Sequence, residues 1–383
     1  MRTLVLSIDP VFPSISGADL RNHMHVMAAC RLGPVLSVSL YPGAAEPDGF
    51  GVASLGNRPR EQYWKGRQGR LDVTAGEAGR LSELVRSFRP DVVLVEGALL
   101  HDLAISHSGS VRLVVDMHNI ESELHRAQGR AEPWTHPFRR WRNIVRAGAF
   151  ATAELALTKA ASAVWVCSEA DRLRLGAATG FFDARVVPNA VPQSALPLAA
   201  HPRDPLIRPN LVFIGHLTYR PNVWAAIEIA SKVLPALRRH RPDATLTFAG
   251  RSPSRRVRRL VAPGVRLIAD PPEIGPILSE ADFAVIPLRT GGGTRIKILE
   301  AMAAGLIVVA TMVAAEGLDL VPGEHFLLAE TAEEMARAVA TMIAEPERAV
   351  RMRAAARQAV LARYAPEAVA ERGMAELRAV AEA

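Results

Sequence analysis

The chain has few of the residues on which metal sites and disulfide frameworks depend. Its only two cysteines, Cys30 and Cys167, lie far apart, and neither has a CxxC partner or metal-ligand spacing. No Asp-x-Asp pair occurs, and no histidine–cysteine cluster has ligand spacing. We therefore expect a reduced compartment, two cysteines buried as small core residues, no metal and no other cofactor.

Long apolar runs and two common phosphate-loop signatures are also absent. No stretch approaches the ~18 uninterrupted apolar residues of a membrane helix, and the opening MRTLVLSIDP predicts a strand rather than a signal peptide. No GxGxxG follows this strand, and no GxxxxGK[ST] occurs. These absences argue against a nicotinamide-type site and a P-loop NTPase, and they favour a cytoplasmic protein.

Aromatic residues make up only 5% of the chain, whereas the net charge is +7. An excess of arginine suits nucleic acid, an anionic membrane surface or an anionic substrate. No aromatic-rich RNA-binding run accompanies the charge, so nucleic acid is the weakest of the three and we expect none as a partner.

Short β-rich runs alternate with helical patterns from end to end, which predicts parallel sheets with crossover helices. The expected strands are residues 3–8, 35–40, 91–96, 111–116, 163–167 and 185–187, then 211–214, 245–249, 265–268, 283–286 and 306–310. This pattern predicts an α/β fold of two Rossmann-like, doubly wound parallel-sheet domains that face a central cleft, where ligands of such sheets bind.

Composition places the domain boundaries. The N-terminal domain is expected at residues 1–190, a linker rich in proline and alanine at 191–209, and the C-terminal domain at 210–363. Residues 364–383 are expected to form a C-terminal helix that crosses back to the N-terminal domain.

The most informative segment is IPLRTGGGTRIKILEAMAAGLIVVAT, residues 286–311, in which a glycine-rich turn joins a strand to a helix. Glycines at 291–293 let the backbone approach a ligand, and a helix N-terminus presents unpaired N–H groups that suit phosphate. Arg295 and Lys297 add positive charge at this place. The segment predicts a site for a phosphorylated molecule such as a nucleotide diphosphate.

The spacing of Gly293, Lys297 and Glu300, at i, i+4 and i+7, predicts that they share one helix face. A carboxylate about two turns below a phosphate-binding tip can accept hydrogen bonds from ribose hydroxyls. The alternative is that Lys297 and Glu300 form only a surface ion pair.

Five segments in this order resemble retaining GT-B glycosyltransferases, and most of all the family-4 type enzymes that build polysaccharides and glycolipids. Besides the glycine-rich turn with its helix ILEAMAAG, they are SGADLRNH (16–23), VVDMHNIESEL (114–124), VVPNAVP (186–192) and FIGHLTYRPNVWA (213–225). The likeness covers nearly the whole chain. It implies transfer from a nucleotide-diphosphate sugar, with retention and without metal, to a hydroxyl of a polysaccharide, lipid-linked or other glycan acceptor.

The chain departs from this family in one respect. The common pattern has two glutamates with seven residues between them, and only the second is present here, as Glu300. Gly292 stands at the position of the first, as in a subgroup with a GGGTR turn, and backbone N–H groups of residues 291–294 would replace it. The resemblance places the N-terminal domain on the acceptor side and the C-terminal domain around the donor.

The resemblance also implies roles for individual residues. The catalytic candidates are His118, Arg295 and Lys297, and the donor-binding candidates are Gly17, Gly215, Arg220, Gly291, Gly292, Gly293, Thr294 and Glu300. Gly17 would let an opposing loop approach the diphosphate, Arg220 and Arg295 would compensate its charge, and His118 would contact the donor sugar. From position alone, His118 could equally be a hydrogen-bonded structural histidine at a strand end.

Residues 133–150, PWTHPFRRWRNIVRAGAF, interleave aromatic residues with arginines. The candidates for contact with an anionic membrane are Trp134, Phe138, Arg139, Arg140, Trp141 and Arg142. Such a pattern suits peripheral binding at the inner face of a membrane. The alternative is a helix that packs its aromatic side chains inward and leaves its arginines in solvent.

Two further readings of the whole chain stay open. One is a nucleotide-sugar epimerase or a phosphorylase on the same fold, although no acid–base set around the sugar can be identified and lysines are few. The other is a non-catalytic GT-B-like scaffold that binds a membrane or a partner through its basic surfaces.

Overall fold

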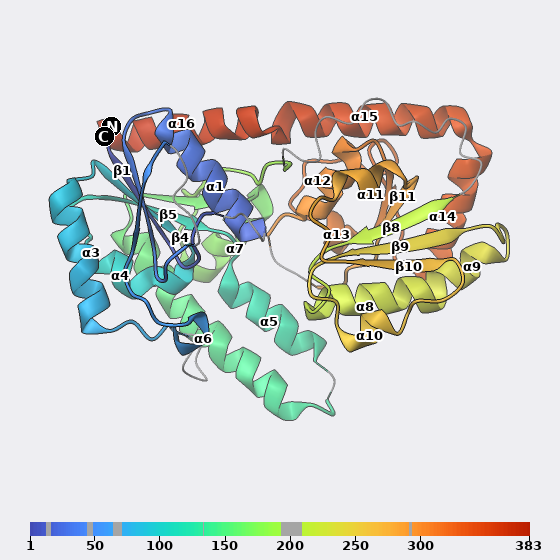
Figure 1. Ribbon diagram of the computed structural model, residues 1–383, viewed down its shortest axis with the longest axis horizontal. Coiled ribbons are helices and arrows are strands. Elements are labelled where there is room, and N and C mark those ends of the chain that lie inside the picture. The colour runs from blue at the N-terminus through green and yellow to red at the C-terminus, as the bar shows by residue number, and fades with distance from the viewer. Residues whose placement is uncertain (13–16, 44–48, 64–70, 133, 193–208, 291–292) are drawn as a thin grey trace. The chain divides into compact units, whose positions relative to one another are not determined.

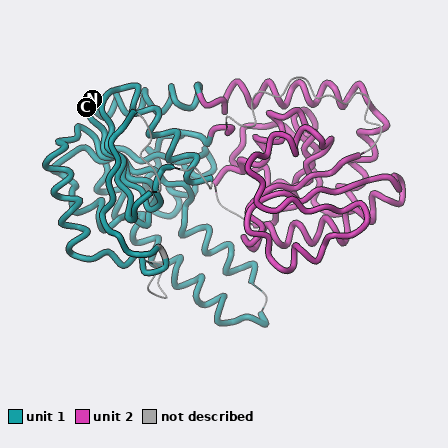
Figure 2. Tube along the Cα trace, in the orientation of Figure 1, with its two compact units in different colours: residues 1–189, 367–383 teal, residues 190–366 magenta. Residues whose placement is uncertain are grey.

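The computed structural model describes residues 1–12, 17–43, 49–63, 71–132, 134–192, 209–290 and 293–383. The chain divides into two compact units (Figure 2). Unit 1 comprises residues 1–189 and 367–383, and unit 2 comprises residues 190–366. Most of the expected linker, residues 193–208, lies outside the described residues. The expected cleft between the domains stays a prediction.

Unit 1 contains a seven-stranded parallel sheet (Figure 1). Its strands are β1 (Thr3–Ser7), β2 (Val35–Ser39), β3 (Gly51–Ser54), β4 (Val92–Glu96), β5 (Arg112–Met117), β6 (Ala163–Val166) and β7 (Arg185–Val186), in the order β3-β2-β1-β4-β5-β6-β7. The residues of β1 and β4 are all buried, as expected for apolar strands covered on both faces. The sequence analysis missed β3, a short edge strand with no fully buried residue.

The helices of unit 1 cover this sheet. They are α1 (Gly17–Cys30), α2 (Arg60–Tyr63), α3 (Ala75–Phe88), η1 (Ala98–Leu100), α4 (His101–Ile105), α5 (Glu121–Ala131), α6 (Pro137–Ala160) and α7 (Glu169–Thr179). The last helix, α16 (Pro366–Glu382), also contributes to unit 1. Its Glu376 carboxylate lies 4.0 Å from the Arg185 guanidinium, and a Cβ added to Gly373 would lie 3.8 Å from Ala28.

Unit 2 contains a six-stranded parallel sheet. Its strands are β8 (Asn210–Ile214), β9 (Thr245–Gly250), β10 (Val265–Ala269), β11 (Phe283–Ile286), β12 (Ile307–Ala310) and β13 (Leu327–Leu328), in the order β10-β9-β8-β11-β12-β13. Its helices are α8 (Arg220–Glu228), a π-helical turn (Ile229–Val233), α9 (Leu234–Arg238), α10 (Arg255–Arg258), α11 (Gly275–Ser279), α12 (Ile296–Ala303), α13 (Met312–Ala315), α14 (Ala332–Ala344) and α15 (Pro346–Tyr364). The sequence analysis missed β13, which has only two residues.

Both sheets have a switch point, where the strand order reverses direction. It lies between β1 and β4 in unit 1 and between β8 and β11 in unit 2. The connections after the two strands leave in opposite directions there, which opens a crevice at the carboxyl ends of doubly wound sheets. The predicted fold class of two doubly wound parallel-sheet domains is confirmed. Among the described residues, no helix combines the length and apolar character that a membrane span needs.

Candidate functional site

In unit 2 the glycine-rich turn follows β11 at the switch point and leads into α12. The helix begins at Ile296, because Arg295 has non-helical dihedral angles (φ −89°, ψ 91°). Gly293 therefore lies in the turn, with a φ of 61° that favours glycine. The expectation that Gly293 shares a helix face with Lys297 and Glu300 is wrong, although the latter two do lie one turn apart on α12. Gly291 and Gly292 lie outside the described residues.

The side chain of Lys297 is held from two sides. Its Nζ donates a hydrogen bond to Asn222 Oδ1 at 2.7 Å and lies 4.4 Å from the centre of the Phe213 ring. Asn222 Nδ2 in turn donates to the His216 carbonyl oxygen at 3.0 Å. Burial, and then the positive charge of Arg295, lower the pKa of Lys297 to about 7. The amine thus has a fixed position near the end of β8 and can change its charge near neutral pH.

Gly215, directly after β8, makes room for this lysine. Its φ is 152°, and an added Cβ would lie 2.9 Å from Lys297 Nζ and 2.9 Å from Asn222 Nδ2. A side chain here would strain the backbone and displace the amine. The structure therefore places Gly215 and Lys297 in one arrangement, although they come from opposite sides of the switch point.

Arg295 supports the turn from within. Its side chain donates to the backbone oxygens of Gly293 and, at 3.4 Å, Val313, and only 8% of the residue is exposed. Thr294 is buried beside it, with 7% exposed. The guanidinium thus ties the glycine-rich turn to α13, and its charge also acts on Lys297. Two cationic groups at one turn create a positive potential that suits an anion.

Glu300 lies one turn further along α12 and is partly buried. Burial raises the pKa of its carboxyl to about 7, and the nearby Lys297 opposes this shift. A carboxyl that is part-protonated at neutral pH can both donate and accept hydrogen bonds, which suits a hydroxyl ligand. This environment differs from that of an exposed surface ion pair.

Arg220 is the first residue of α8, the helix that also carries Asn222. Its guanidinium lies 4.3 Å from the centre of the Trp224 ring. Burial, and then the charge of Arg256, lower its pKa. Its role at a diphosphate stays a prediction.

In unit 1, His118 follows β5 directly. Its Nε2 lies 3.1 Å from Glu96 Oε2 and 3.2 Å from Asp116 Oδ2. Burial lowers the pKa of His118, but the two carboxylates outweigh this effect and raise it above its ordinary value. The two carboxylates therefore favour the protonated form of this imidazole more than water would.

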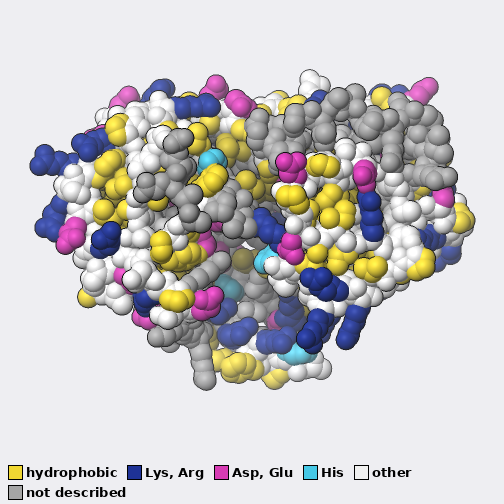
Figure 3. Space-filling view, viewed as in Figure 1, with side chains coloured by type: hydrophobic (Ala, Val, Ile, Leu, Met, Phe, Trp, Pro, Cys, Tyr) yellow, Lys and Arg dark blue, Asp and Glu magenta, His cyan; other side chains and the backbone are white. Residues whose placement is uncertain are grey.

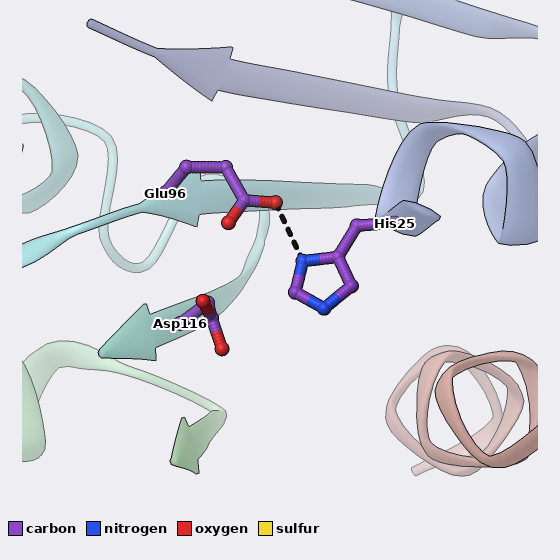
Figure 4. Close-up of side chains that lie close together, drawn as sticks. All are labelled: His25, Glu96 and Asp116. Atoms are coloured by element: carbon purple, nitrogen blue, oxygen red, sulfur yellow. Dashed lines mark hydrogen bonds and ion pairs between the residues drawn. The ribbon is translucent and has the colours of Figure 1, made fainter. Parts of the chain in front are cut away.

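A buried ionic cluster lies beside His118, and Figure 4 shows three of its other members, His25, Glu96 and Asp116. Arg21 on α1 donates to both Asp116 oxygens, at 2.7 and 2.5 Å, and His25 Nδ1 lies 2.8 Å from Glu96 Oε1. The two carboxylates are 0–2% exposed. Burial would raise the pKa of Glu96, but the two histidines hold it well below its usual range. The cluster joins α1, β4 and β5 at the switch point of unit 1.

The same cluster contains three potential metal ligands, because oxygen or nitrogen atoms of His25, Glu96 and Asp116 lie within 4.8 Å of one another. Arg21, however, already occupies both Asp116 oxygens, and His25 is bonded to Glu96 through Nδ1. The Arg21 guanidinium already supplies positive charge beside Asp116. The residues do not fit a resident metal ion.

Gly17 is the first residue of α1, the helix that carries Arg21 and His25. The residues just before it, 13–16, lie outside the described part of the chain. The sequence analysis missed Arg21, Glu96 and Asn222. One signal was available for Glu96, since it ends a buried apolar strand at the carboxyl edge of the sheet.

Residues 208–345, which span the sheet of unit 2, match the family model "Glycosyl transferases group 1". The glycogen synthase of Mycobacterium tuberculosis is 25% identical over 395 residues, which cover 94% of this chain and 90% of that protein. The sucrose-phosphate synthase of Thermosynechococcus elongatus has a similar fold, with a TM-score of 0.77, 17% identity and 100% of both chains covered.

A second solved structure with this fold is Anabaena Alr3699/HepE in complex with UDP-glucose. Its TM-score is 0.74 and its identity 16%, with 99% of this chain and 100% of that chain covered. The fold is thus that of GT-B proteins. With the matched domain, it makes the protein a glycosyltransferase enzyme.

Proposed function

We propose that this glycosyltransferase moves a sugar from a nucleotide-diphosphate sugar to a hydroxyl of a polysaccharide, lipid-linked or other glycan acceptor. The observation that carries the proposal is the position of the Lys297 amine, fixed by Asn222 and Gly215 at the switch point of unit 2. Phosphorylated ligands of doubly wound sheets bind at this edge. The UDP-glucose complex of Alr3699/HepE makes UDP-sugars the first donors to test.

The transfer breaks the anomeric C–O bond and leaves negative charge on the departing diphosphate. Fixed cations and N–H groups at the oxygen where this charge develops lower the barrier. Lys297 and the amides of the turn, supported by Arg295, would supply them. An approaching diphosphate would raise the pKa of Lys297 from about 7 and keep the amine charged.

We propose that the reaction needs no metal, because these cationic groups would take over the compensation of charge. Glu300 would bind ribose hydroxyls through its part-protonated carboxyl. The imidazole of His118 would contact the donor sugar. The acceptor hydroxyl would attack from the face that the diphosphate leaves and would pass its proton to the departing diphosphate. The anomeric configuration would then be retained without a covalent intermediate.

The first experiment compares thermal unfolding of the wild type and Arg295→Ala with UDP-glucose, GDP-mannose and ADP-glucose. A ligand at a hundred times its Kd stabilises a protein by about 2.7 kcal/mol. We expect a shift with one donor that is lost in Arg295→Ala. Arg255→Ala is the control, because Arg255 is exposed on α10 and the substitution removes the same charge.

Turnover tests the same assignment. Arg295→Ala should slow sugar transfer far more than Arg255→Ala, and equal losses would refute the phosphate site. NMR of the product's anomeric proton tests retention, and activity in excess EDTA tests metal independence. If none of the three nucleotide sugars shifts the unfolding of the wild type, the proposed donor site in unit 2 is refuted for these donors.

A further inference from the structure

The helices α5 and α6 form an antiparallel hairpin in unit 1 (Figure 1). One face of α6 packs inward, where Asn143, Ala147 and Phe150 are buried. Gly129 on α5 lies against Asn143, since a Cβ added there would be 3.4 Å from that side chain. The Phe150 ring stacks on His125 of α5 at 5.3 Å. The hairpin therefore has its own apolar contacts on this side.

The opposite face of α6 carries large apolar side chains in solvent. Trp134, just before the helix, is 80% exposed, and Phe138, Trp141 and Ile144 are 58%, 54% and 56% exposed. The last three recur every third residue and so lie along one side of the helix. We call these four residues the hairpin patch. Hydrophobic side chains are visible at the lower edge of Figure 3, below the body of unit 1. The alternative of inward-packed aromatic residues is wrong.

Arginines surround the hairpin patch. Residues 126–146 contain six arginines and a single glutamate, Glu132, which is only 7% exposed. The Arg140 guanidinium lies 4.1 Å from the centre of the Trp134 ring, and the rings of Phe138 and Trp141 are 5.8 Å apart. Basic and aromatic side chains of α6 and of the residues just before it are thus exposed together on one surface.

We propose that the hairpin patch docks on an anionic phospholipid bilayer, with its rings at headgroup depth and its arginines on lipid phosphates. Amphipathic helices with Trp, Phe and Leu beside Lys and Arg bind membrane interfaces in this way. Each basic residue near the surface adds electrostatic attraction to anionic lipids. The docking surface is inferred from the geometry of the hairpin alone. That docking would bring the enzyme to a lipid-linked acceptor rests on the proposed function.

Charge argues against two other occupants. In a symmetric dimer through this face, the same arginines would meet their own copies, and like charges opposed across an interface are costly. An acidic polymer would satisfy the arginines, but it would leave the Phe138 and Ile144 side chains in water. A bilayer covers both kinds of group at once.

Vesicle sedimentation of the whole protein tests the proposal. The vesicles contain either phosphatidylcholine alone or equal parts of phosphatidylcholine and phosphatidylglycerol. We expect binding to the anionic vesicles, falling as salt is added. Phe138→Ser/Trp141→Ser and Arg139→Gln/Arg140→Gln should each lower the partition constant about tenfold or more. The matched control is Arg255→Gln/Arg259→Gln, which removes two exposed arginines, one on α10 and one directly after it, and should change binding little.

Nucleotide-sugar binding, measured on the same samples, separates the two proposals. All three variants should bind the donor as the wild type does, because none touches the site in unit 2. Docking without donor binding would refute the enzyme site and keep the membrane surface. Sedimentation that is absent, or equal for all three variants, would overturn the docking surface. A soluble anionic polysaccharide that binds equally well to Phe138→Ser/Trp141→Ser and to the wild type, while vesicles do not bind, would assign the arginines to an acidic polymer.

Discussion

The Lys297 amine on α12 donates a hydrogen bond of 2.7 Å to the side-chain oxygen of Asn222 on α8. The two residues are 75 positions apart in the chain and approach from opposite sides of the switch point of unit 2. Asn222 also donates to the His216 carbonyl oxygen, so its own orientation is fixed. Asn222 thus positions the Lys297 amine without having to contact the ligand itself.

Removal of this support should weaken donor binding. In Asn222→Ala the amine loses a charge-assisted hydrogen bond worth about 1.5–3 kcal/mol, and we expect the Kd for the nucleotide sugar to rise about tenfold. Titration calorimetry measures the change. The control is Asn210→Ala at the opposite end of β8, where the side chain bonds Thr245 and the Glu280 backbone. An equal loss of affinity in the control would show a general effect on the fold.

The pKa of Lys297, about 7, gives donor binding a pH dependence. The amine is charged below this pH and neutral above it, so binding of a diphosphate weakens as the pH rises through 7. If only the charged form binds, the Kd should rise about fivefold between pH 7 and pH 8. The diphosphate diester of a nucleotide sugar does not titrate in this range, so the slope reports on the protein.

Glu300 loses its proton over the same range, because its pKa is also about 7. Its negative charge would oppose the diphosphate, so it acts in the same direction as the loss of charge on Lys297. Lys297→Arg should therefore reduce the slope, and Lys297→Arg/Glu300→Gln should abolish it. A wild-type Kd that is constant from pH 6 to pH 8.5 would contradict the placement of Lys297 at the phosphates.

Gly215→Ala tests the room left for Lys297. The new Cβ would lie 2.9 Å from the amine, and the residue would keep a φ of 152°. We expect a loss of stability of about 1–3 kcal/mol from backbone strain and a fall in donor affinity of about tenfold or more. Gly323→Ala is the control, because φ is 84° there but no atom lies within 4 Å of the added Cβ. Chemical denaturation should show a loss of stability in both variants. Titration calorimetry should show a loss of donor affinity only in Gly215→Ala.

Features of the fold could be predicted from the sequence where their signal lies in one short segment of the chain. Val92–Glu96 and Phe283–Ile286 were predicted to within one residue, because a parallel strand buried on both faces is a continuous apolar run. The edge strand Gly51–Ser54 lacks that signal. The helix α12 was placed, but its start was not, since Arg295 has non-helical dihedral angles although arginine is a good helix former.

The candidate site likewise has a part that one segment predicts and a part that depends on distant residues. The glycine-rich turn with Arg295, Lys297 and Glu300 is one contiguous segment, so its chemistry could be read from the sequence. Asn222 could not be connected with it, because only the order of strands in the sheet brings the two together. Arg21 and Asp116, which are 95 residues apart, are a second case. Their pairing depends on β1, β4 and β5 being neighbours.

The last prediction concerns the contribution of the Arg21–Asp116 ion pair to the stability of unit 1. Both side chains are almost completely buried, at 2% and 0% exposed. Arg21→Met leaves the Asp116 carboxylate without its main partner, and loss of one member of a buried pair costs about 3–5 kcal/mol. Denaturant unfolding should show a loss of this size. Arg266→Met, which breaks the exposed pair with Glu280, should cost less than about 1 kcal/mol.

The double variant Arg21→Met/Asp116→Leu tells whether the loss comes from an uncompensated charge. It removes the carboxylate as well, so it should be more stable than Arg21→Met alone, as found when apolar residues replace a whole buried pair. If the double variant is less stable than the wild type by the sum of the two single losses, the two side chains act independently. His118 would still be bonded to Glu96 in the double variant. The variant removes Asp116, which raises the pKa of His118, and also Arg21, whose charge lowers it, and Asp116 has the larger effect. NMR titration of the His118 ring should therefore show a lower pKa in this variant than in the wild type.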